Sequence, residues 1–306
     1  MSTSLKPLVV PPASNPAPKA EGLAAKIRLT LEMIKFEHSV FALPFALTGA
    51  MLARRGLPTW RELLWIVVAM VGARSAAMTF NRIADLKFDA LNPRTRGRAL
   101  PAGKLSLPFA AGFTVFSCAL LVLAAYELNP LAFKLSPVAI AVLFGYSFTK
   151  RFTVLSHLIL GLCLGMSPPA AWIALRGDLS VSVLLLGAAV VLWVAGFDII
   201  YACQDVEFDH TLGLHSIPER YGIRAALWIS VLLHVGALAL LIAVQRRENL
   251  GGIAIAGLVI VAALLAYEHS LVKPNDLSRV NAAFFTVNGF ISMLLFLAWG
   301  ADLLSH

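Results

Sequence analysis

Charged residues are scarce in this sequence: Asp, Glu, Lys and Arg make up 14% of its 306 residues. Since soluble domains usually contain about 25% charged residues, this deficit indicates that lipid surrounds much of the chain. The three cysteines, Cys118, Cys163 and Cys203, fall in apolar stretches without a C-x-x-C spacing, which argues against a disulfide framework or a zinc site. A glycine-rich phosphate loop, a G-x-S-x-G elbow and a nucleotide-binding fingerprint are also missing, so the sequence offers none of these catalytic devices.

The main feature of the sequence is a series of long apolar stretches. Apolar residues make up 59% of the chain and recur from about residue 38 to residue 300 without a soluble insertion. A helix needs about 20 mostly apolar residues to cross a bilayer. Nine segments meet this need: residues 36–54, 61–88, 107–126, 130–149, 153–175, 179–204, 223–245, 250–270 and 280–302. We therefore expect an all-α integral membrane protein with nine transmembrane helices in one domain, residues 22–306.

The start of the chain and the fifth segment have features of their own. Residues 1–21 are rich in Pro, Ser and Ala and lack the apolar core of a signal peptide, so we expect a disordered cytoplasmic tail. Residues 24–35 predict a short amphipathic helix at the membrane surface. Pro168 and Pro169 fall inside the fifth segment and should bend its helix.

The formal net charge of +8 raises the question of a nucleic-acid partner. Because the basic residues sit in short loops, without an aromatic-interleaved patch, we expect no nucleic acid and interpret them as membrane anchors. With a cytoplasmic N-terminus, sixteen Lys and Arg residues fall on the cytoplasmic side and seven on the other, while Arg74 and Arg82 lie within the second segment. This imbalance predicts a multi-pass protein of the cell's inner membrane with its C-terminus outside.

Acidic residues recur in one pattern at the ends of two apolar segments. Residues 85–89 and residues 205–209 both read D-x-x-F-D. On straight helices the polar residues near each copy would form a stripe along one face. The first stripe is Asn81, Asp85 and Asp89, and the second is Asp198, Tyr201, Asp205 and Asp209. Carboxylates in a bilayer are costly, which marks them as functional; the plainer alternative is pairing with Arg82 and Lys87 or contact with the interface.

We hypothesise that the two stripes face each other across a site for divalent metal and diphosphate. Mg²⁺ prefers oxygen ligands and is usually held by a few carboxylates together with substrate phosphates. The expected ligands are Asp85, Asp89, Asp205 and Asp209. The loop after the first stripe adds Arg94 and Arg98, whose guanidinium groups suit phosphate oxygens. Anchoring of the loop by the positive-inside rule is the alternative for each arginine.

Other polar residues extend this hypothesis. Tyr146 and Lys150 are four residues apart at the same expected side, where they can meet the diphosphate or serve as an interfacial anchor. Arg74 lies seven residues before Asn81 on the same helical face, so it can bind a substrate carboxylate or compensate an acid of the second stripe. Three histidines lack metal-ligand spacing and are interpreted as structural hydrogen-bonding groups: His38, His157 and His215.

At these residues the chain resembles the UbiA-type intramembrane aromatic prenyltransferases. The shared features are the N-D/R-x-x-D-x-x-x-D pattern, the R-T-x-x-R loop that follows it, the second acidic motif and the Tyr146/Lys150 pair. Residues 37–46 and 196–209 look like the 4-hydroxybenzoate polyprenyltransferase-like group, especially members linked to the futalosine route to menaquinone. One departure is Arg82, which stands where many relatives carry Asp.

The resemblance implies the UbiA prenyltransferase fold, with nine helices around a central cavity and a lipid tail that leaves sideways into the bilayer. It also implies Mg²⁺, a polyprenyl diphosphate donor and an aromatic acceptor such as 4-hydroxybenzoate, in ubiquinone or menaquinone biosynthesis. A futalosine-pathway or naphthoate-type acceptor is the alternative. The expected catalytic residues are Asp85, Asp205 and Asp198. Asp198 is the candidate base that removes the ring proton, and the alternative is that it binds metal. The expected substrate-binding residues are Arg74, Asn81, Arg94, Arg98, Tyr146, Lys150 and Tyr201.

Two other classes of membrane protein use intramembrane acids. A cation-coupled transporter usually places them at mid-depth on interrupted helices, whereas these lie at expected helix ends beside an arginine-rich loop. A phosphatidyl-type alcohol phosphotransferase also uses D-x-x-x-D with Mg²⁺, but its longer D-G-x-x-A-R pattern is missing from this sequence.

Overall fold

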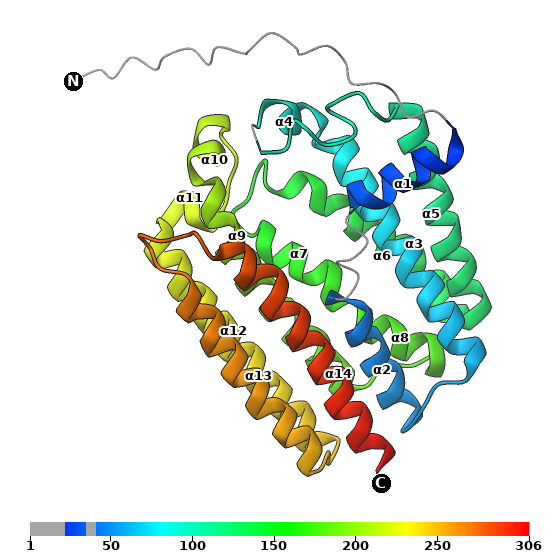
Figure 1. Cartoon of the computed structure of the whole chain (residues 1–306). Helices are drawn as coiled ribbons and strands as arrows, with labels where there is room; N and C mark the ends of the chain where they lie inside the picture. Colours follow the sequence, from blue (N-terminus) through cyan, green and yellow to red (C-terminus); the bar gives the residue numbers. More distant parts are fainter. Residues whose placement is uncertain (1–21, 35–40, 93, 306) are drawn as a thin grey trace.

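The protein, described by a computed structural model over residues 22–34, 41–92 and 94–305, is a bundle of helices (Figure 1). No β-strand occurs in these ranges, apart from an isolated bridge between Lys273 and Asp276. The helices are α1 Leu23–Ile34, α2 Leu43–Arg54, α3 Trp60–Ala84, α4 Leu86–Leu91, α5 Leu107–Leu128, α6 Pro130–Thr149, α7 Ser156–Gly165, α8 Ser167–Arg176, α9 Val181–Ala202, α10 Val206–Leu212, α11 Ile217–Tyr221, α12 Ile223–Arg247, α13 Gly252–Leu271 and α14 Asn288–Leu304. A 3₁₀ turn, Cys203–Asp205, follows α9, and a π-helical turn, Ala282–Val287, leads into α14.

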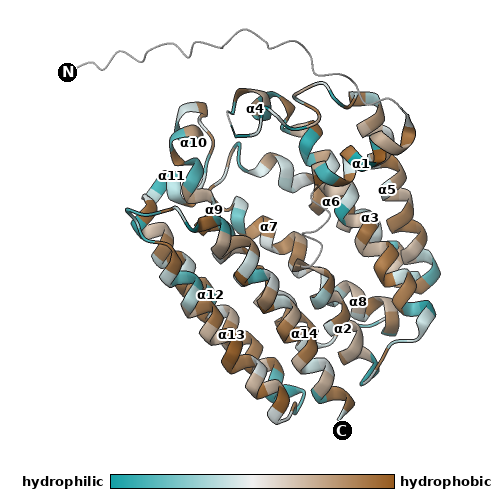
Figure 2. Ribbon diagram, viewed as in Figure 1, coloured by the Kyte–Doolittle hydropathy of each residue, from teal (hydrophilic) through white to brown (hydrophobic). Residues whose placement is uncertain are grey.

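In the described ranges, eight segments are long and apolar enough to cross a membrane. One combines α7 with α8, one runs from α9 through α10, and one joins the π-helical turn to α14. The expected all-α membrane architecture is thereby confirmed. Large apolar side chains such as Val115, Trp228 and Phe290 are exposed on the outside of the bundle, where lipid can cover them. Residues of high hydropathy, brown in Figure 2, occur along the long helices. Part of the expected first span, 36–54, and the expected tail, 1–21, lie outside the described residues. Because α2 has only 12 residues in the described part, the count of nine stays a prediction.

Three expected spans are interrupted. The bend at Pro168 and Pro169 is confirmed, since α7 ends at Gly165 and α8 begins at Ser167. The expectation of one helix over residues 61–88 is wrong: α3 ends at Ala84 and α4 begins at Leu86. Likewise, the second stripe does not lie on one straight helix. Asp198 lies on α9, Asp205 ends the 3₁₀ turn and Asp209 lies on α10. The sequence around the last two breaks favours helix, so local propensity gives no warning of them.

Helix α1 confirms the amphipathic segment expected before the first span. Thr30 and Ile34 are buried against the bundle, while Leu23, Ile27 and Leu31 are exposed at a spacing of four residues. The exposed side chains form an apolar stripe on the outer side of the helix. Such a stripe suits a helix that lies along the membrane surface.

Helix α9 carries Asp198 and Tyr201, and close packing against α7 sets its position. A Cβ atom at Gly161 of α7 would lie 2.3 Å from the carbonyl oxygen of Val191 of α9. We expect Gly161→Ala to destabilise the protein by roughly 1–3 kcal/mol, because backbone and not a flexible side chain would have to move. Gly145→Ala is the matched control, since a Cβ there meets nothing within 4 Å. Thermal unfolding in detergent measures both; equal melting temperatures would contradict the packing described.

Candidate active site

A polar pocket of about 200 Å³ lies at the end of the bundle where α4 and α10 are found (Figure 1). It is lined by side chains from both D-x-x-F-D segments, from the loop that follows α4 and from the ends of α6, α7 and α9. The residues that line it are Asn81, Arg82, Asp85, Phe88, Asp89, Asn92, Arg94, Thr95, Arg98, Tyr146, Ser147, Lys150, Arg151, Ser156, His157, Asp198, Tyr201, Ala202, Asp205, Phe208, Asp209 and Leu214. Both acidic stripes therefore open into one chamber.

The two D-x-x-F-D segments have the same local structure. The first aspartate of each lies between two helical segments with similar backbone angles, φ −93° and ψ 8° for Asp85, and φ −105° and ψ 7° for Asp205. This bridge region is sparsely populated and is frequent at functional sites. The last aspartate of each segment, Asp89 or Asp209, is buried one turn further along.

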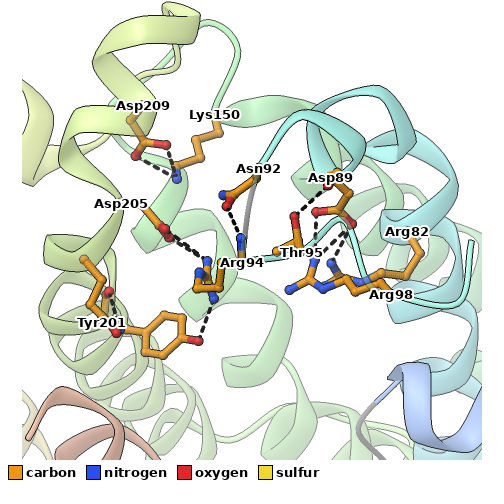
Figure 3. Close-up of polar contacts among 11 residues, drawn as sticks. Arg82, Asp89, Asn92, Arg94, Thr95, Arg98, Lys150, Tyr201, Asp205 and Asp209 are labelled. Carbon is orange, nitrogen blue, oxygen red and sulfur yellow. Dashed lines mark hydrogen bonds and ion pairs between the residues drawn. The ribbon is translucent and has the colours of Figure 1, made fainter. Parts of the chain in front are cut away.

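Every aspartate of the first segment contacts arginine. Arg98 donates to both carboxylate oxygens of Asp89 at 2.8 and 2.9 Å, and Arg82 donates to Oδ2 at 3.1 Å (Figure 3). Asp85 accepts from Arg151 at 3.2 Å and from the amide of Asn81 at 2.9 Å. An ion pair between these aspartates and Arg82 was the alternative to a functional role. Arg82 does pair with Asp89, but it does so inside a pocket and not at an open interface.

Burial raises the pKa of Asp85 and of Asp89, and the neighbouring arginines offset part of that rise. The negative charge of Asp85 adds to the rise for Asp89. A carboxylate whose charged form is disfavoured by burial is stabilised by any cation that reaches it. The arginines supply that charge in the structure, and a metal ion can replace them.

The second segment shows the same arrangement with other cations. Arg94 donates to both oxygens of Asp205 at 2.8 and 3.1 Å and to the hydroxyl of Tyr201 at 2.9 Å (Figure 3). Lys150 lies 2.8 Å from the buried carboxylate of Asp209. Arg94 belongs to the loop after the first D-x-x-F-D segment and contacts Asp205 of the second. It therefore connects the two sides of the pocket.

The loop that carries Arg94 is shaped by an asparagine. Asn92 accepts the backbone N–H of Arg94 at 2.9 Å through its side-chain oxygen, and Thr95 donates to the backbone carbonyl of Asp89 at 3.0 Å. These local bonds turn the chain back over the first segment. Arg96 is exposed and does not line the pocket, whereas Arg94 and Arg98 do.

Most of the residues expected from the sequence meet in this pocket, but their roles remain predictions. Arg74 is the exception: it lies two turns deeper on α3 than Asn81 and is not among the residues that line the pocket. Sequence reasoning missed Arg151 as a partner of Asp85. It also interpreted His157 as a structural group, whereas the side chain lines the pocket 2.7 Å from Asp198. The position of Arg151 beside Lys150 was a usable signal; nothing local marks His157.

A second cavity, of about 510 Å³ and almost entirely apolar, lies deeper among α3 and α5 to α9. Its wall includes Met70, Ala139 and Leu162, from helices that also line the polar pocket. Two wall residues, Val138 and Leu184, are 57% and 49% exposed, so the cavity reaches the outer surface of the bundle. In a bilayer that surface faces lipid.

Comparison with known proteins agrees with this geometry. Residues 42–294 match the UbiA prenyltransferase family. The chain belongs to the UbiA prenyltransferase family. Two relatives are the 4-hydroxybenzoate octaprenyltransferase of Vibrio cholerae, 32% identical over 275 residues that cover 89% of this chain and 96% of the relative, and that of Vibrio parahaemolyticus, 31% identical over 244 residues, 80% and 85%.

Solved structures of UbiA homologues have the same fold. The apo structure of a UbiA homolog from Aeropyrum pernix has a TM-score of 0.80 and 37% identity, covering 88% of this chain and 98% of its own. A homolog from Archaeoglobus fulgidus, bound to DMAPP and Mg²⁺, has a TM-score of 0.69 at 20% identity, with 90% and 99% covered. This UbiA-family chain is thus a multi-pass membrane prenyltransferase, which sets aside the transporter and alcohol phosphotransferase alternatives.

In this UbiA-family pocket, Arg94 contacts both carboxylate oxygens of Asp205, and the prediction is that it exchanges them for the diphosphate of the donor. We expect Arg94→Gln to raise the KM for a diphosphate donor about thirtyfold, the equivalent of losing about 2 kcal/mol from a charge-assisted hydrogen bond. It should leave Mg²⁺ binding unchanged or tighter, because the variant removes a cation that occupies Asp205. Steady-state kinetics and Mg²⁺ titrations measure the two effects. Arg96→Gln is the control; equal KM values for the two variants would contradict the role of Arg94.

Proposed function

We propose that the chain transfers a polyprenyl group from a polyprenyl diphosphate to an aromatic acceptor that bears hydroxyl and carboxylate groups, such as 4-hydroxybenzoate, in the biosynthesis of a respiratory quinone. The observation that carries the proposal is the meeting of both D-x-x-F-D segments and five basic side chains around one polar pocket. The family relatives that act on 4-hydroxybenzoate support this acceptor. A futalosine-pathway or naphthoate-type acceptor is the second candidate.

The residues of the pocket fit Mg²⁺ as the metal. The four proposed carboxylate ligands and the carbonyl oxygen of the Asn81 amide are all oxygen donors. In the part of the chain that the structure describes, no three His, Cys, Asp or Glu side chains are close enough to hold an ion by themselves. This fits Mg²⁺, which is usually held by one or two carboxylates and completed by substrate phosphates and water. Asp85 and Asp205, at equivalent helix breaks, are the proposed principal ligands, with Asp89 and Asp209 behind them.

When bound, Mg²⁺ supplies positive charge that stabilises the departing diphosphate. The chain adds its own cations for the same purpose. Arg94, Arg98 and Lys150 are already directed into the pocket by their contacts with aspartates, so they can exchange those carboxylates for phosphate oxygens. Asp89 is held by two arginines and is the carboxylate least free to bind metal.

The acceptor is proposed to lie between Asn81 and Asp198 on the inner side of the pocket. Ionisation of the allylic C–O bond gives a cation that water would quench, so a partly buried chamber protects it. The aromatic ring attacks this cation, and Asp198 accepts the proton that the ring loses. Tyr201 is held by Arg94 and packs on Phe284 at a centroid distance of 4.3 Å, so it can line the path of the allylic group; Tyr146 lines the same chamber. A role for Arg74 in binding the acceptor carboxylate remains a proposal that the pocket lining does not support.

The apolar cavity is proposed to hold the polyprenyl tail. Its mouth at Val138 and Leu184 gives the tail a sideways path into the bilayer, as expected for a donor that is a lipid. We further propose that the protein lies in the inner membrane with the polar pocket open to the cytoplasm, where soluble acceptors and Mg²⁺ are available. The excess of basic residues on that side supports this orientation.

One experiment tests the whole proposal. Membranes that contain the purified protein are incubated with a labelled prenyl diphosphate, with and without Mg²⁺, and with each candidate acceptor in turn. Mass spectrometry identifies the product. A Mg²⁺-dependent prenylated 4-hydroxybenzoate supports the proposal, a prenylated futalosine-type or naphthoate product favours the second candidate, and no prenylated product with any of them refutes it.

A further inference from the structure

One of the five aspartates in the polar pocket has a different kind of partner from the others. Four of them contact an arginine or a lysine: Asp85, Asp89, Asp205 and Asp209. Asp198, on α9, instead lies 2.7 Å from the ring of His157, measured from Oδ2 to Nδ1. It can therefore accept a proton without first breaking an ion pair with an arginine or a lysine.

The surroundings of His157 select one tautomer of its ring. The backbone N–H of Ile217, the first residue of α11, points at Nε2 from 3.3 Å. A backbone amide can only donate, so Nε2 must carry a lone pair and the ring hydrogen must be on Nδ1. Nδ1–H then donates to Oδ2 of Asp198. His157 is only 2% exposed, so water does not compete for either ring nitrogen.

We infer that His157 is a positioning residue that orients Asp198 as the proton acceptor of prenyl transfer, an inference that rests on the function proposed above. The hydrogen bond to Oδ2 fixes the plane of the carboxylate and leaves Oδ1 for the substrate. His157 itself is a poor proton acceptor, because its one lone pair already receives the amide hydrogen of Ile217. Both side chains line the pocket, and the aspartate is the more exposed of the two, 20% against 2%.

The reaction that His157 supports needs only the prenyl donor and the aromatic acceptor. The C–O bond to the diphosphate breaks and its electron pair leaves on the diphosphate, while a π pair of the ring forms the new C–C bond. The ring C–H bond at that carbon then breaks and its electron pair restores the aromatic ring. The proton passes to Oδ1 of Asp198 and is afterwards released to water.

Two variants of His157 separate positioning from simple packing. His157→Leu introduces an apolar side chain of similar bulk that cannot donate a hydrogen bond. We expect it to lower kcat about tenfold to a hundredfold with both KM values unchanged. His157→Asn places an amide nitrogen near the position of Nδ1 and should restore most of the rate. The exposed His215 provides the control, since His215→Leu should have no effect.

A kinetic isotope effect gives a readout that a packing defect would not move. With an acceptor deuterated at the substituted ring carbon, His157→Leu should show a primary isotope effect that the wild type lacks, because proton loss has become slow. A wild-type rate for His157→Leu would overturn the inference. A rate loss that shows no isotope effect and no rescue by asparagine would overturn it equally.

The tautomer can be tested apart from catalysis. In ¹⁵N NMR spectra of the full-length protein in micelles, labelled at histidine and assigned with His157→Asn, we expect the ring to be protonated at Nδ1 only. Protonation at Nε2 would overturn the inference. If the wild type prenylates no candidate acceptor, the proposed function fails while this measurement still decides the geometry of His157 and Asp198.

Discussion

Replacing Asp205 by alanine should reduce prenyl transfer about a thousandfold while leaving the protein folded in the membrane. Asp205 is one of two aspartates at equivalent helix breaks, and both line the polar pocket. Its loss would remove a proposed metal ligand where charge develops on the diphosphate, a position where single groups contribute a hundredfold to a thousandfold. Transfer of a labelled prenyl group, measured at saturating Mg²⁺, checks this expectation.

The fold should tolerate this change because the partner of Asp205 keeps other contacts. Arg94 is 41% exposed and also bonds to the hydroxyl of Tyr201, so it is not left as a buried unpaired charge. Glu207→Ala is the control: Glu207 lies two residues further along and is exposed. If Asp205→Ala retained near-normal turnover, or if Glu207→Ala lost as much activity, the two-segment site would be refuted.

The membrane fold and the two acidic segments were predictable because both depend on patterns along the chain. Apolar stretches of sufficient length indicate spans whatever their neighbours are. The repeat of D-x-x-F-D marks Asp85 and Asp205 as equivalent, and the structure gives them nearly the same backbone angles. The breaks at these residues were not predictable. Leucine and lysine, which follow Asp85, favour a continued helix.

The partners of the aspartates depend on contacts between distant parts of the chain. His157 meets Asp198 only because Gly161 lets α7 lie against the backbone of α9. Arg98 returns to Asp89 because the loop is folded back by Asn92. Neither the glycine contact nor the direction of the loop has a sequence pattern that assigns a partner. The residue types and their gathering at one end of the bundle were therefore predictable, whereas the pairing was not.

Filling the apolar cavity should make the enzyme distinguish donors by length. Ala139 lines this cavity on α6, and we expect Ala139→Trp to lower transfer from a long polyprenyl diphosphate about a hundredfold. Each buried methylene contributes about 0.8 kcal/mol, so displacing three to four carbons of one isoprenoid unit removes roughly 3 kcal/mol of binding. Dimethylallyl diphosphate has no tail beyond the reacting unit, and its transfer should change less than threefold. Competition between the two donors, followed by mass, measures the ratio directly.

A tryptophan two residues further along the same helix separates occupation of the cavity from a general effect on α6. Ala141 is exposed on the lipid side and does not line the cavity, so Ala141→Trp should leave both donors at wild-type rates. If Ala139→Trp slowed the short and the long donor equally, the tail would not lie in this cavity. The polar pocket would then bind the diphosphate while the tail left by another route, because the charge pairs around Asp205 and Asp89 do not depend on the apolar cavity.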